Sequence, residues 1–380
     1  MVGEIILSIP VLKPAIGEEE IKAAAEVLRS GWLGLGPRTE EFERQFAAYI
    51  GAPYAVALNS GTAALHLAVE ALGIAKGDEV IVTPMTFVST VHAISYVGAV
   101  PIFADIVPDT MNIDIYDIER KITDKTKAIM VVHLAGHPCD MDKINELAGY
   151  HGLHVIEDAA HACGAKYKGR YVGSGANLTC FSFHAVKNLT CGEGGAVTCT
   201  NEWYERYFKE MRWVGISKDT WVRSSKEKAY AWQYWIEKVG YKYHMSDINA
   251  AIGLVQLGKL EMLNEKRRVI AQKYTEGLED LEWLELPYEK SYAESSWHLY
   301  QVKVQDQDIR DSFMQHLKDN DISPGVHYMP IHLQPCYRGV KAIVPVANRI
   351  WKRMLTVPLY PDMTDDEVNK VVEVIRQYKV

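Results

Sequence analysis

FSFHAVKNLTCGEGG, residues 181–195, joins a strand-like pattern to a glycine-rich loop that carries one lysine. Phe181 and Phe183 alternate with smaller or polar residues, which predicts one buried face of a strand. Lys187 follows four residues later. A lysine is costly to bury without a partner, and a lysine on the open surface does not need this setting. The stretch therefore predicts a strand end that presents Lys187 to a functional site.

Strand-like segments surround this stretch and alternate with segments of helical spacing from about residue 55 to residue 200. The helical segments include TAALHLAVEAL (62–72) and DMDKINELAGYHG (140–152). Such alternation predicts an α/β domain in which helices cover a mostly parallel sheet. The predicted strands are YAVALN (54–59), EVIVTP (79–84), VPIFAD (100–105), AIMVVHL (128–134), HVIEDA (154–159), CFSFH (180–184) and GGAVTC (194–199).

The character of the chain changes near residue 200. Residues 203–243 are rich in Trp, Tyr, Lys and Arg without a clear period, and we expect irregular surface structure there. A long amphipathic helix is predicted over 246–278, with Ser246 as its cap. A strand (297–304) and two helices (309–320 and 364–378) follow. We therefore expect a large domain over 1–245, with residues 1–30 able to pack on the other domain, and a small C-terminal α/β domain over 246–380.

Composition excludes several classes of protein. The 380 residues are 48% hydrophobic and 24% charged, and the formal net charge is −8, so nothing draws the chain to nucleic acid or an anionic membrane. The first residues lack the pattern of a signal peptide, and no apolar run reaches the roughly 20 residues of a membrane span. Six cysteines without a CxxC pair predict buried thiols. Together these features predict a cytoplasmic protein.

His133, His137 and Cys139 lie close together in VVHLAGHPCD and are the candidates for a metal site. No second pair of ligands follows at a spacing typical of zinc sites. The segment is better explained as a strand end followed by a turn, and we predict no metal.

Polar or small residues fall at four predicted strand ends or helix starts, where ligands bind in a doubly wound sheet. These points are Asn59–Thr62, Thr86–Phe87, Asp158–His161 and Ser182–Lys187. Each point alone has an ordinary structural explanation. Their convergence from four separate segments is what predicts a binding site.

The first of these points suits a phosphate. A Gly61-Thr62 pair at the start of a helix frees backbone N–H groups and adds a hydroxyl, although a plain helix cap would look the same. The phosphate loop GxxxxGK[ST] is absent, and LGLGPRT is not the dinucleotide fingerprint GxGxxG.

The remaining points suit a ring cofactor. Asp158 ends a buried strand and needs either several hydrogen-bond donors or a cation, which a protonated ring nitrogen or another Arg or Lys would supply. His161 could bond to the same ligand or be structural. Phe87 could supply an aromatic face or pack in the core, and Ser182 could donate to phosphate or to the strand. Lys187 is the member of this set that can react covalently, since a desolvated lysine forms a Schiff base with an aldehyde. Pyridoxal 5′-phosphate needs all of these groups together.

The motifs of this chain resemble those of the DegT/DnrJ/EryC1/StrS family of sugar aminotransferases, pyridoxal-phosphate enzymes of the aspartate-aminotransferase fold (type I). The resemblance runs through almost the whole chain. It is carried by SGWLGLGPRTEEFE, NSGTAALHLA, GDEVIVTPMTFVST, TKAIMVVHLAGHP, VIEDAAHACGAKYKG, FSFHAVKNLTCGEGG, GYKYHMSDINAAIGLVQL and GVHYMPIHLQPCYR.

The resemblance implies a role for each predicted residue. Lys187 would bind the cofactor's aldehyde and later move the proton. Asp158 would pair with the ring nitrogen, His161 would face the phenolic oxygen or the ring, and Phe87 would stack on it. Gly61, Thr62 and Ser182 would hold the phosphate.

The resemblance also implies a homodimer with shared active sites, because GYKYHMSD would reach into the neighbouring subunit. Many relatives read GYNYRM there, so Lys242 takes the place of a phosphate-binding asparagine and His244 that of an arginine. Lysine still reaches a phosphate as a point charge.

The implied reaction moves an amino group from L-glutamate to a keto-sugar nucleotide for polysaccharide biosynthesis. FSFHAVKNLTC and EDAAHA resemble the branch that acts on a UDP-linked 4-keto-arabinose, whereas GVHYMPIHLQPCYR resembles enzymes of 6-deoxy-4-keto hexoses. His327 and Tyr328 are candidates for the sugar pocket. Candidate partners of the diphosphate are Lys13, Arg38, Arg223 and Lys228.

Other functions were weighed. A keto-cyclitol, a 3-keto sugar, or a GDP- or dTDP-linked sugar would serve the same chemistry. Sugar 3-dehydratases of the family carry histidine at the lysine position, which Lys187 argues against. A non-catalytic scaffold would not need Lys187, Asp158 and Ser182, and a metal hydrolase lacks its ligands.

Overall fold

The computed structural model describes residues 8–216, 235–236 and 238–380 and is built around a seven-stranded sheet. All seven strands predicted between residues 54 and 199 lie in this sheet. The strands follow the order β1-β9-β8-β5-β4-β2-β3. Their bounds are β1 (Tyr54–Leu58), β2 (Glu79–Val82), β3 (Val100–Phe103), β4 (Thr126–Val132), β5 (His154–Asp158), β8 (Leu178–Ser182) and β9 (Gly195–Cys199).

The sheet is mostly parallel, as predicted. β3, β2, β4, β5 and β8 run parallel to one another, whereas β9 is antiparallel to both β8 and β1. Parallel strands bring their carboxyl ends to one edge, so the polar residues that follow β5 and β8 lie at the same edge.

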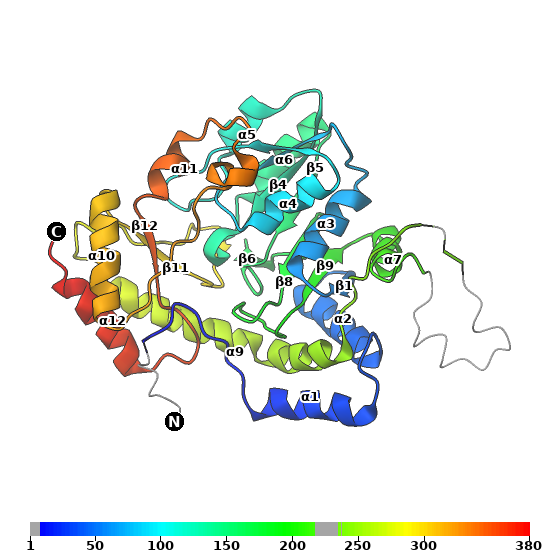
Figure 1. The fold of residues 1–380 in the computed structure, drawn as a ribbon, viewed down its shortest axis with the longest axis horizontal. Helices are drawn as coiled ribbons and strands as arrows, with labels where there is room; N and C mark the ends of the chain where they lie inside the picture. The colour runs from blue at the N-terminus through cyan, green and yellow to red at the C-terminus, as the bar shows by residue number, and fades with distance from the viewer. Residues whose placement is uncertain (1–7, 217–234, 237) are drawn as a thin grey trace.

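Helices cover both faces of the sheet (Figure 1). α3, α4 and α7 pack on one face, and α2, α5, α6 and the first half of α9 pack on the other. This arrangement confirms the predicted α/β class. The bounds are α1 (Glu18–Ser30), α2 (Pro37–Ile50), α3 (Gly61–Ala71), α4 (Val88–Tyr96), α5 (Ile115–Lys121), α6 (Met141–His151), α7 (Glu202–Met211) and α9 (Asp247–Leu278).

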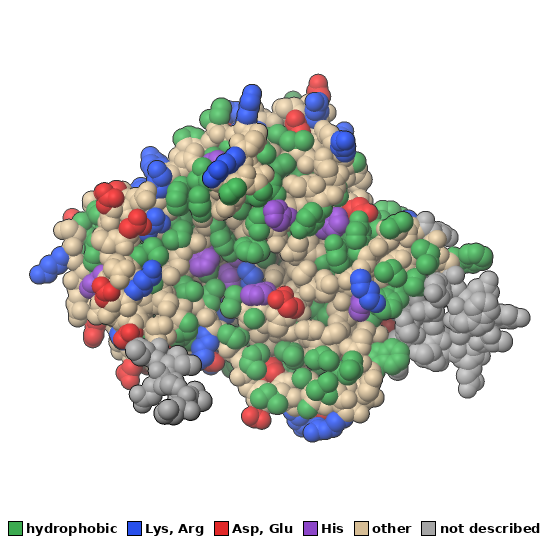
Figure 2. Space-filling model, viewed as in Figure 1, with side chains coloured by type: hydrophobic (Ala, Val, Ile, Leu, Met, Phe, Trp, Pro, Cys, Tyr) green, Lys and Arg blue, Asp and Glu red, His purple; other side chains and the backbone are tan. Residues whose placement is uncertain are grey.

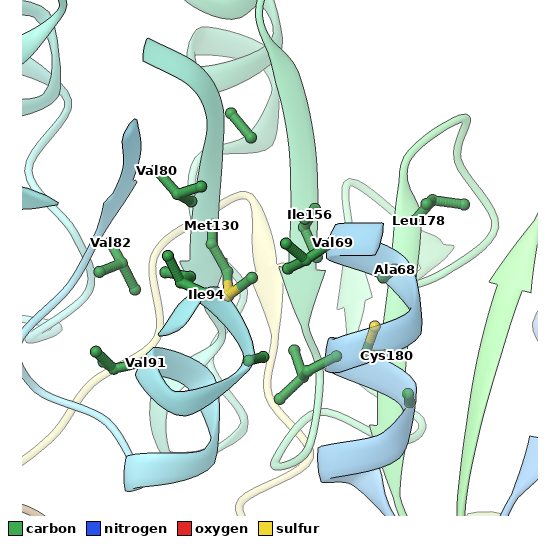
Figure 3. Close-up of a cluster of buried hydrophobic side chains, with 14 of the residues drawn as sticks. Ala68, Val69, Val80, Val82, Val91, Ile94, Met130, Ile156, Leu178 and Cys180 are labelled. Atoms are coloured by element: carbon green, nitrogen blue, oxygen red, sulfur yellow. The ribbon is translucent and has the colours of Figure 1, made fainter. Parts of the chain in front are cut away.

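Apolar side chains fill the layer between the sheet and helices α3 and α4 (Figure 3). Val82 of β2, Met130 of β4 and Ile156 of β5 point from the sheet toward Ala68 of α3 and Ile94 of α4. These side chains are fully buried. The packed layer holds the start of α3 rigidly against the ends of the strands, which is where the candidate site lies.

The opposite face confirms the alternation predicted for residues 181–183. Phe181 and Phe183 both point to the layer of α2, where their rings meet those of Phe46 and Phe42 at centroid distances of 5.1 and 5.3 Å. The edge-to-face geometry is favourable for aromatic pairs. Ser182, between them, faces the other side of the sheet and lines the cavity described below.

A second apolar cluster lies outside the sheet and joins the end of α9 to the C-terminal elements. Ile9 belongs to it, and its backbone pairs with Asp321 and Ser323. A capping box at Thr364 begins the last helix. The elements are β10 (Ala293–Glu294), β11 (Tyr300–Lys303), α10 (Gln307–Asp319), α11 (Pro345–Ile350), β12 (Met354–Val357) and α12 (Asp365–Gln377), while β10 pairs with β6 (Lys166–Tyr167) and β7 (Arg170–Tyr171).

The packing does not follow a single cut at residue 245. Ala250, Leu257 and Leu260 of α9 pack on the large sheet, whereas Tyr274 and Leu278 of the same helix pack on the second cluster. Residues of α11 also pack on the large sheet. A helix of this length spans both bodies, so the division at 245/246 stays a prediction.

Three other expectations need comment. The expectation of irregular structure over 203–243 is wrong at its start, because α7 is an amphipathic helix capped by Asn201. Five cysteines are buried, but Cys336 is exposed. Within the described residues, no helix is both long and apolar enough to cross a membrane.

Candidate active site

A cavity of about 360 Å³ opens at the carboxyl ends of β5 and β8, beside the start of α3. In Figure 2, histidine side chains gather in the hollow near the centre of this face, above the segment formed by α1 and α9. The cavity brings together nine of the predicted residues: Gly61, Thr62, Phe87, Asp158, His161, Ser182, Lys187, His327 and Tyr328.

The start of α3 forms one wall of the cavity. Ser60 is the N-cap, and its Oγ accepts from the Ala63 amide at 3.1 Å. The amides of Gly61 and Thr62 come before the first intrahelical bond, so they face the end of the helix where anions bind. A Cβ at Gly61 would lie 2.9 Å from the Ser182 Cβ, so only glycine lets the helix come this close to β8.

Asp158 stands at the end of β5 and is 4% exposed. Thr90 Oγ1 donates to its Oδ2 at 2.7 Å, and the Ala160 amide donates to its Oδ1 at 3.0 Å. Burial raises the pKa of this carboxyl, while the two hydrogen bonds and the charge of Lys187 oppose the rise. Two neutral donors do not compensate a buried carboxylate fully, so the site favours an additional cation.

Lys187 follows β8 in a loop that folds back on the strand. The Phe183 amide donates to Gly194 O and the Cys191 amide donates to Phe183 O, while the Lys187 amide donates to His184 O. The side chain is half-buried and lines the cavity. Desolvation lowers the pKa of the Lys187 amine to about 8, although Asp158 opposes the change. Such an amine is a competent nucleophile near neutral pH.

His161 lies between two aromatic partners in the cavity wall. Its Nε2 is 3.1 Å from the Tyr328 hydroxyl, and its ring centroid is 4.4 Å from that of His298. Its Nδ1 is buried and has no hydrogen-bond partner. Desolvation lowers the pKa of His161 well below its usual value, so the ring is neutral. An unpaired nitrogen on a neutral ring is available to a ligand.

Phe87 and His327 complete the predicted set. Phe87 is the N-cap residue of α4 and is 57% exposed, with its ring centroid 6.2 Å from that of Tyr328. His327 Nδ1 is 2.9 Å from Thr356 Oγ1, and burial lowers the pKa of the ring to about 4.

Lys242 lies outside the cavity of its own chain. Its side chain is exposed, and Nζ sits 3.3 Å from the centre of the Trp213 ring. Lys13 and Arg38 also lie elsewhere, with Lys13 over Tyr360 and Arg38 paired with Glu41. Arg223 and Lys228 fall outside the described residues.

Sequence reasoning missed two residues of the site. Thr90 holds Asp158, and the only signal was its place three residues after Phe87 in the first turn of a helix. His298 lines the cavity from the segment before β11, more than 100 residues from Lys187. No spacing in the sequence indicates a contact of this range.

In the segment with the candidate metal ligands, the ring of His133 bonds to other protein groups. His133 is fully buried, its Nε2 lies 2.9 Å from Glu157 Oε2, and its Nδ1 accepts from the Cys139 amide at 3.1 Å. Both ring nitrogens are therefore engaged. Among the described residues, no group of three or more His, Cys, Asp or Glu side chains is arranged to hold a metal ion.

The residues of the cavity fit pyridoxal 5′-phosphate. The start of α3 with Ser182 offers a seat for the phosphate, and the close approach at Gly61 keeps this seat open. Asp158 lacks a cation, His161 Nδ1 lacks a partner, and Lys187 is an amine with a lowered pKa. A protonated ring nitrogen, a phenolic oxygen and an aldehyde would match these three groups in turn.

Comparison with known proteins identifies relatives over almost the whole length of the chain. The model of the DegT/DnrJ/EryC1/StrS aminotransferase family matches residues 14–376. The spore coat polysaccharide biosynthesis protein SpsC of Bacillus subtilis is 43% identical over 376 residues, which cover 97% of this chain and 96% of SpsC.

Solved structures show the same fold. Spr1654 of Streptococcus pneumoniae in its PMP form superposes with a TM-score of 0.92 at 35% identity, covering 97% of this chain and 98% of that one. The sugar aminotransferase CalS13 of Micromonospora echinospora gives a TM-score of 0.88 at 31% identity, covering 97% and 99% of the two chains. These similarities confirm the predicted type I transferase fold.

Proposed function

This chain belongs to the DegT/DnrJ/EryC1/StrS aminotransferase family, and on that premise we propose that it moves an amino group from L-glutamate to the ketone of a nucleotide-linked sugar, with pyridoxal 5′-phosphate as its cofactor. One observation carries the proposal. Lys187 and Asp158 share one enclosed cavity with the start of α3, without an ion pair between them. SpsC is a polysaccharide biosynthesis protein, which supports a role in making an amino sugar for a cell-surface polysaccharide.

When bound, pyridoxal 5′-phosphate supplies an aldehyde that condenses with amines and a ring that accepts electrons from the carbon next to the nitrogen. Lys187 would bind that aldehyde through Nζ when no substrate is present. Once displaced, the Lys187 amine would take the proton from the donor's α-carbon and deliver it to another carbon. The pKa of about 8 suits an amine that must both accept and release a proton.

Asp158 would pair with the ring nitrogen and keep it protonated. Thr90 and the Ala160 amide orient the carboxylate for this task. A cation at Asp158 would lower the pKa of the carboxyl again, so the pair would be charged when the cofactor is in place. Gly61, Thr62 and Ser182 would hold the phosphate, Phe87 would cover the ring, and His161 would face its phenolic oxygen.

His327 and Tyr328 are proposed to line the sugar pocket, since both line the cavity. Both half-reactions would use the same cavity, so ping-pong kinetics are expected. The acceptor proposed first is a UDP-linked 4-keto sugar, because the sequence around Lys187 resembles the enzymes of that branch.

A homodimer is part of the proposal, with Lys242 of each chain serving the partner's cavity. Lys242 is exposed, and its neighbour Tyr243 accepts from the Asn59 amide at 2.7 Å, directly before the start of α3. Trp235 and Val239 are 71% and 92% exposed nearby, which supports a covered surface.

The dimer has its own test. If Lys242→Ala loses activity, mixing it with Lys187→Ala should restore part of the turnover in hybrid dimers, because one site then has both residues intact. No restoration after verified subunit exchange would contradict a shared site.

The test of function is a screen of keto-sugar nucleotides with L-glutamate, in which 2-oxoglutarate and the amino product are followed by mass spectrometry. UDP-linked 4-keto sugars are expected to react fastest. Turnover with a keto-cyclitol such as scyllo-inosose, but with no nucleotide sugar, would overturn the proposed acceptor and leave the aminotransferase chemistry standing.

A further inference from the structure

A chain of buried hydrogen bonds lies directly behind the cavity and ends on His298. Asn264 Nδ2 donates to Cys163 O at 3.0 Å. Asn188 Nδ2 donates to Asn264 Oδ1 at 2.8 Å and to Ser296 O at 2.7 Å. Backbone carbonyls only accept, so the orientation of both asparagine amides is fixed. The amide oxygen of Asn188 must then be the acceptor for His298 Nδ1, at 2.9 Å.

This network determines the tautomer of His298. Because Nδ1 carries the proton that Asn188 accepts, Nε2 of the neutral ring has a free lone pair. A carboxylate at position 188 would stabilise a charged imidazolium, whereas an amide does not. The other groups that bear on His298 are Lys187, Arg267, His161 and His327, and each of them disfavours a positive charge on its ring.

The segment that carries His298 is tied to the large sheet. The His298 amide donates to Ala135 O at 2.9 Å, and the Ser296 amide donates to Gly136 O at 3.2 Å. A Cβ at Gly136 would lie 2.5 Å from Ser296 Oγ, and the φ of +94° also favours glycine. Ser296 Oγ donates to His161 O at 2.8 Å. The two histidines are therefore held against each other by their backbones.

His298 in turn holds two residues of the site. Its ring lies 4.4 Å from that of His161, with 36° between the planes, while Tyr328 binds the far edge of His161. Asn188 directly follows Lys187, so the anchored amide also fixes the backbone that carries the lysine. A displacement of His298 would reach both His161 and Lys187.

We propose that His298 is a positioning residue for the amino transfer. With the Nδ1 proton held by Asn188, the neutral ring of His298 fixes the ring of His161 and offers its Nε2 lone pair as an acceptor to the cavity beside Lys187. Burial and the neighbouring basic groups exclude a second positive charge from this wall, and the amide at position 188 does not offset them as a carboxylate would. The expected effects on the rate of amino transfer rest on the proposed function, whereas the tautomer of His298 does not.

The first test needs no activity. Cofactor-free enzyme with ring-¹⁵N histidine is studied by NMR, and the His298 signals are identified by their loss in His298→Gln. We expect protonated Nδ1 and bare Nε2 at pH 7 and at pH 6. An imidazolium at pH 7, or the opposite tautomer, would overturn the proposal even if the enzyme proved to have another substrate.

The second test changes the charge of the acceptor. In Asn188→Asp, His298 should become charged at pH 7, and release of 2-oxoglutarate from L-glutamate in a single turnover should fall at least about ten-fold. The ratio of variant to wild-type rate should recover as the pH rises and the ring loses its proton. A ratio that stays constant across pH would refute the role of the neutral ring.

The matched control is Asn112→Asp. Asn112 is also buried beside a histidine, with Nδ2 3.5 Å from His137 Nδ1, but neither residue lines the cavity. Its rate ratio should not depend on pH. If Asn188→Asp does not fold, His298→Phe keeps the aromatic stack and removes both ring nitrogens; a wild-type single-turnover rate in this variant would likewise overturn the proposal.

Discussion

The pair Arg212 and Glu43 and the pair Lys187 and Asp158 are both enclosed by the protein, but only the first pair is in contact. Arg212 is fully buried, and its guanidinium binds the Glu43 carboxylate and Ala57 O. The Ala57 amide donates to the same carboxylate at 2.8 Å. The two charges thus meet directly, and β1 is fixed to α2 and to the end of α7.

The cavity pair is arranged in the opposite way. No hydrogen bond or ion pair joins Lys187 to Asp158 in the described part of the chain, and the pKa of each group is displaced toward its neutral form. The contact pair serves folding, whereas a ligand is proposed to supply the partner of each group in the cavity. Substitutions should therefore separate cleanly into losses of activity and losses of stability.

Lys187→Ala tests the strongest form of this contrast. Turnover should fall by at least about 10⁴-fold, because this one side chain is proposed to provide both cofactor attachment and proton transfer. The free energy of unfolding should stay the same or rise, since an unpaired enclosed charge is removed. Amino transfer is measured with L-glutamate and a keto-sugar nucleotide, and stability by urea unfolding of the cofactor-free enzyme.

Lys166→Ala is the control for that substitution. Lys166 pairs with Glu294 at 2.9 Å away from the cavity, and its loss should leave turnover unchanged. Substantial turnover in Lys187→Ala, or a large loss of stability there, would remove the basis of the comparison.

Asp158→Asn should lower turnover by about 10³-fold, because an amide cannot hold a positive charge on the ring nitrogen. Stability should change little, since the amide still offers an oxygen to Thr90 or Ala160.

The neighbouring Glu157 is the matched control. It faces the other side of the sheet and binds His133 and Asn177, so Glu157→Gln should cost stability and spare turnover. Equal effects of the two variants on turnover would contradict the assignment of Asp158.

The sequence predicted the strand side of the cavity better than the side formed by the C-terminal half. Asp158, Ser182 and Lys187 follow strands with clear alternation, and parallel strands must end at a common edge. Their meeting is a consequence of local patterns. The start of α3 was predictable for the same reason, because Ser60-Gly61-Thr62 precedes a regular apolar helix.

The contribution of His298 was not predictable in this way. Its position depends on a segment that packs against Gly136, which is 162 residues away in the sequence. It also depends on a hydrogen bond to Asn188, which is 110 residues away. Such contacts leave no periodic signal. The burial of Arg212 was also not predicted. Arg212 is the C-cap residue of α7, and the many aromatic and charged residues in this stretch made the helical period hard to recognise.

Arg212→Met should show the reverse pattern to Lys187→Ala. Removing Arg212 leaves the buried Glu43 carboxylate with only the more distant Lys209, 3.8 Å away, and we expect a loss of about 3–5 kcal/mol in the free energy of unfolding. The double variant with Glu43→Gln should recover part of the loss. Turnover per folded molecule should stay within about three-fold of wild type, because neither residue lines the cavity. A loss of less than about 1 kcal/mol would show that the contact pair is not structural.

The smallest expected effect is the contribution of Lys187 to the dependence of stability on pH. The pKa of Lys187 is about 8 in the folded, cofactor-free protein and 10.5 in its ordinary state. Between these values the unfolded chain binds a proton that the folded chain does not, so the free energy of unfolding rises with pH across this window. The penalty at neutral pH is at most about 3 kcal/mol, and water in the cavity reduces it. Lys187→Met should therefore be more stable than wild type at pH 7, and the difference should shrink as the pH approaches 10.5. Urea unfolding of both proteins over this pH range measures the difference in the free energy of unfolding. A difference that does not change with pH would mean that Lys187 is not held as an unpaired amine. The contrast with the Arg212–Glu43 pair would then be wrong.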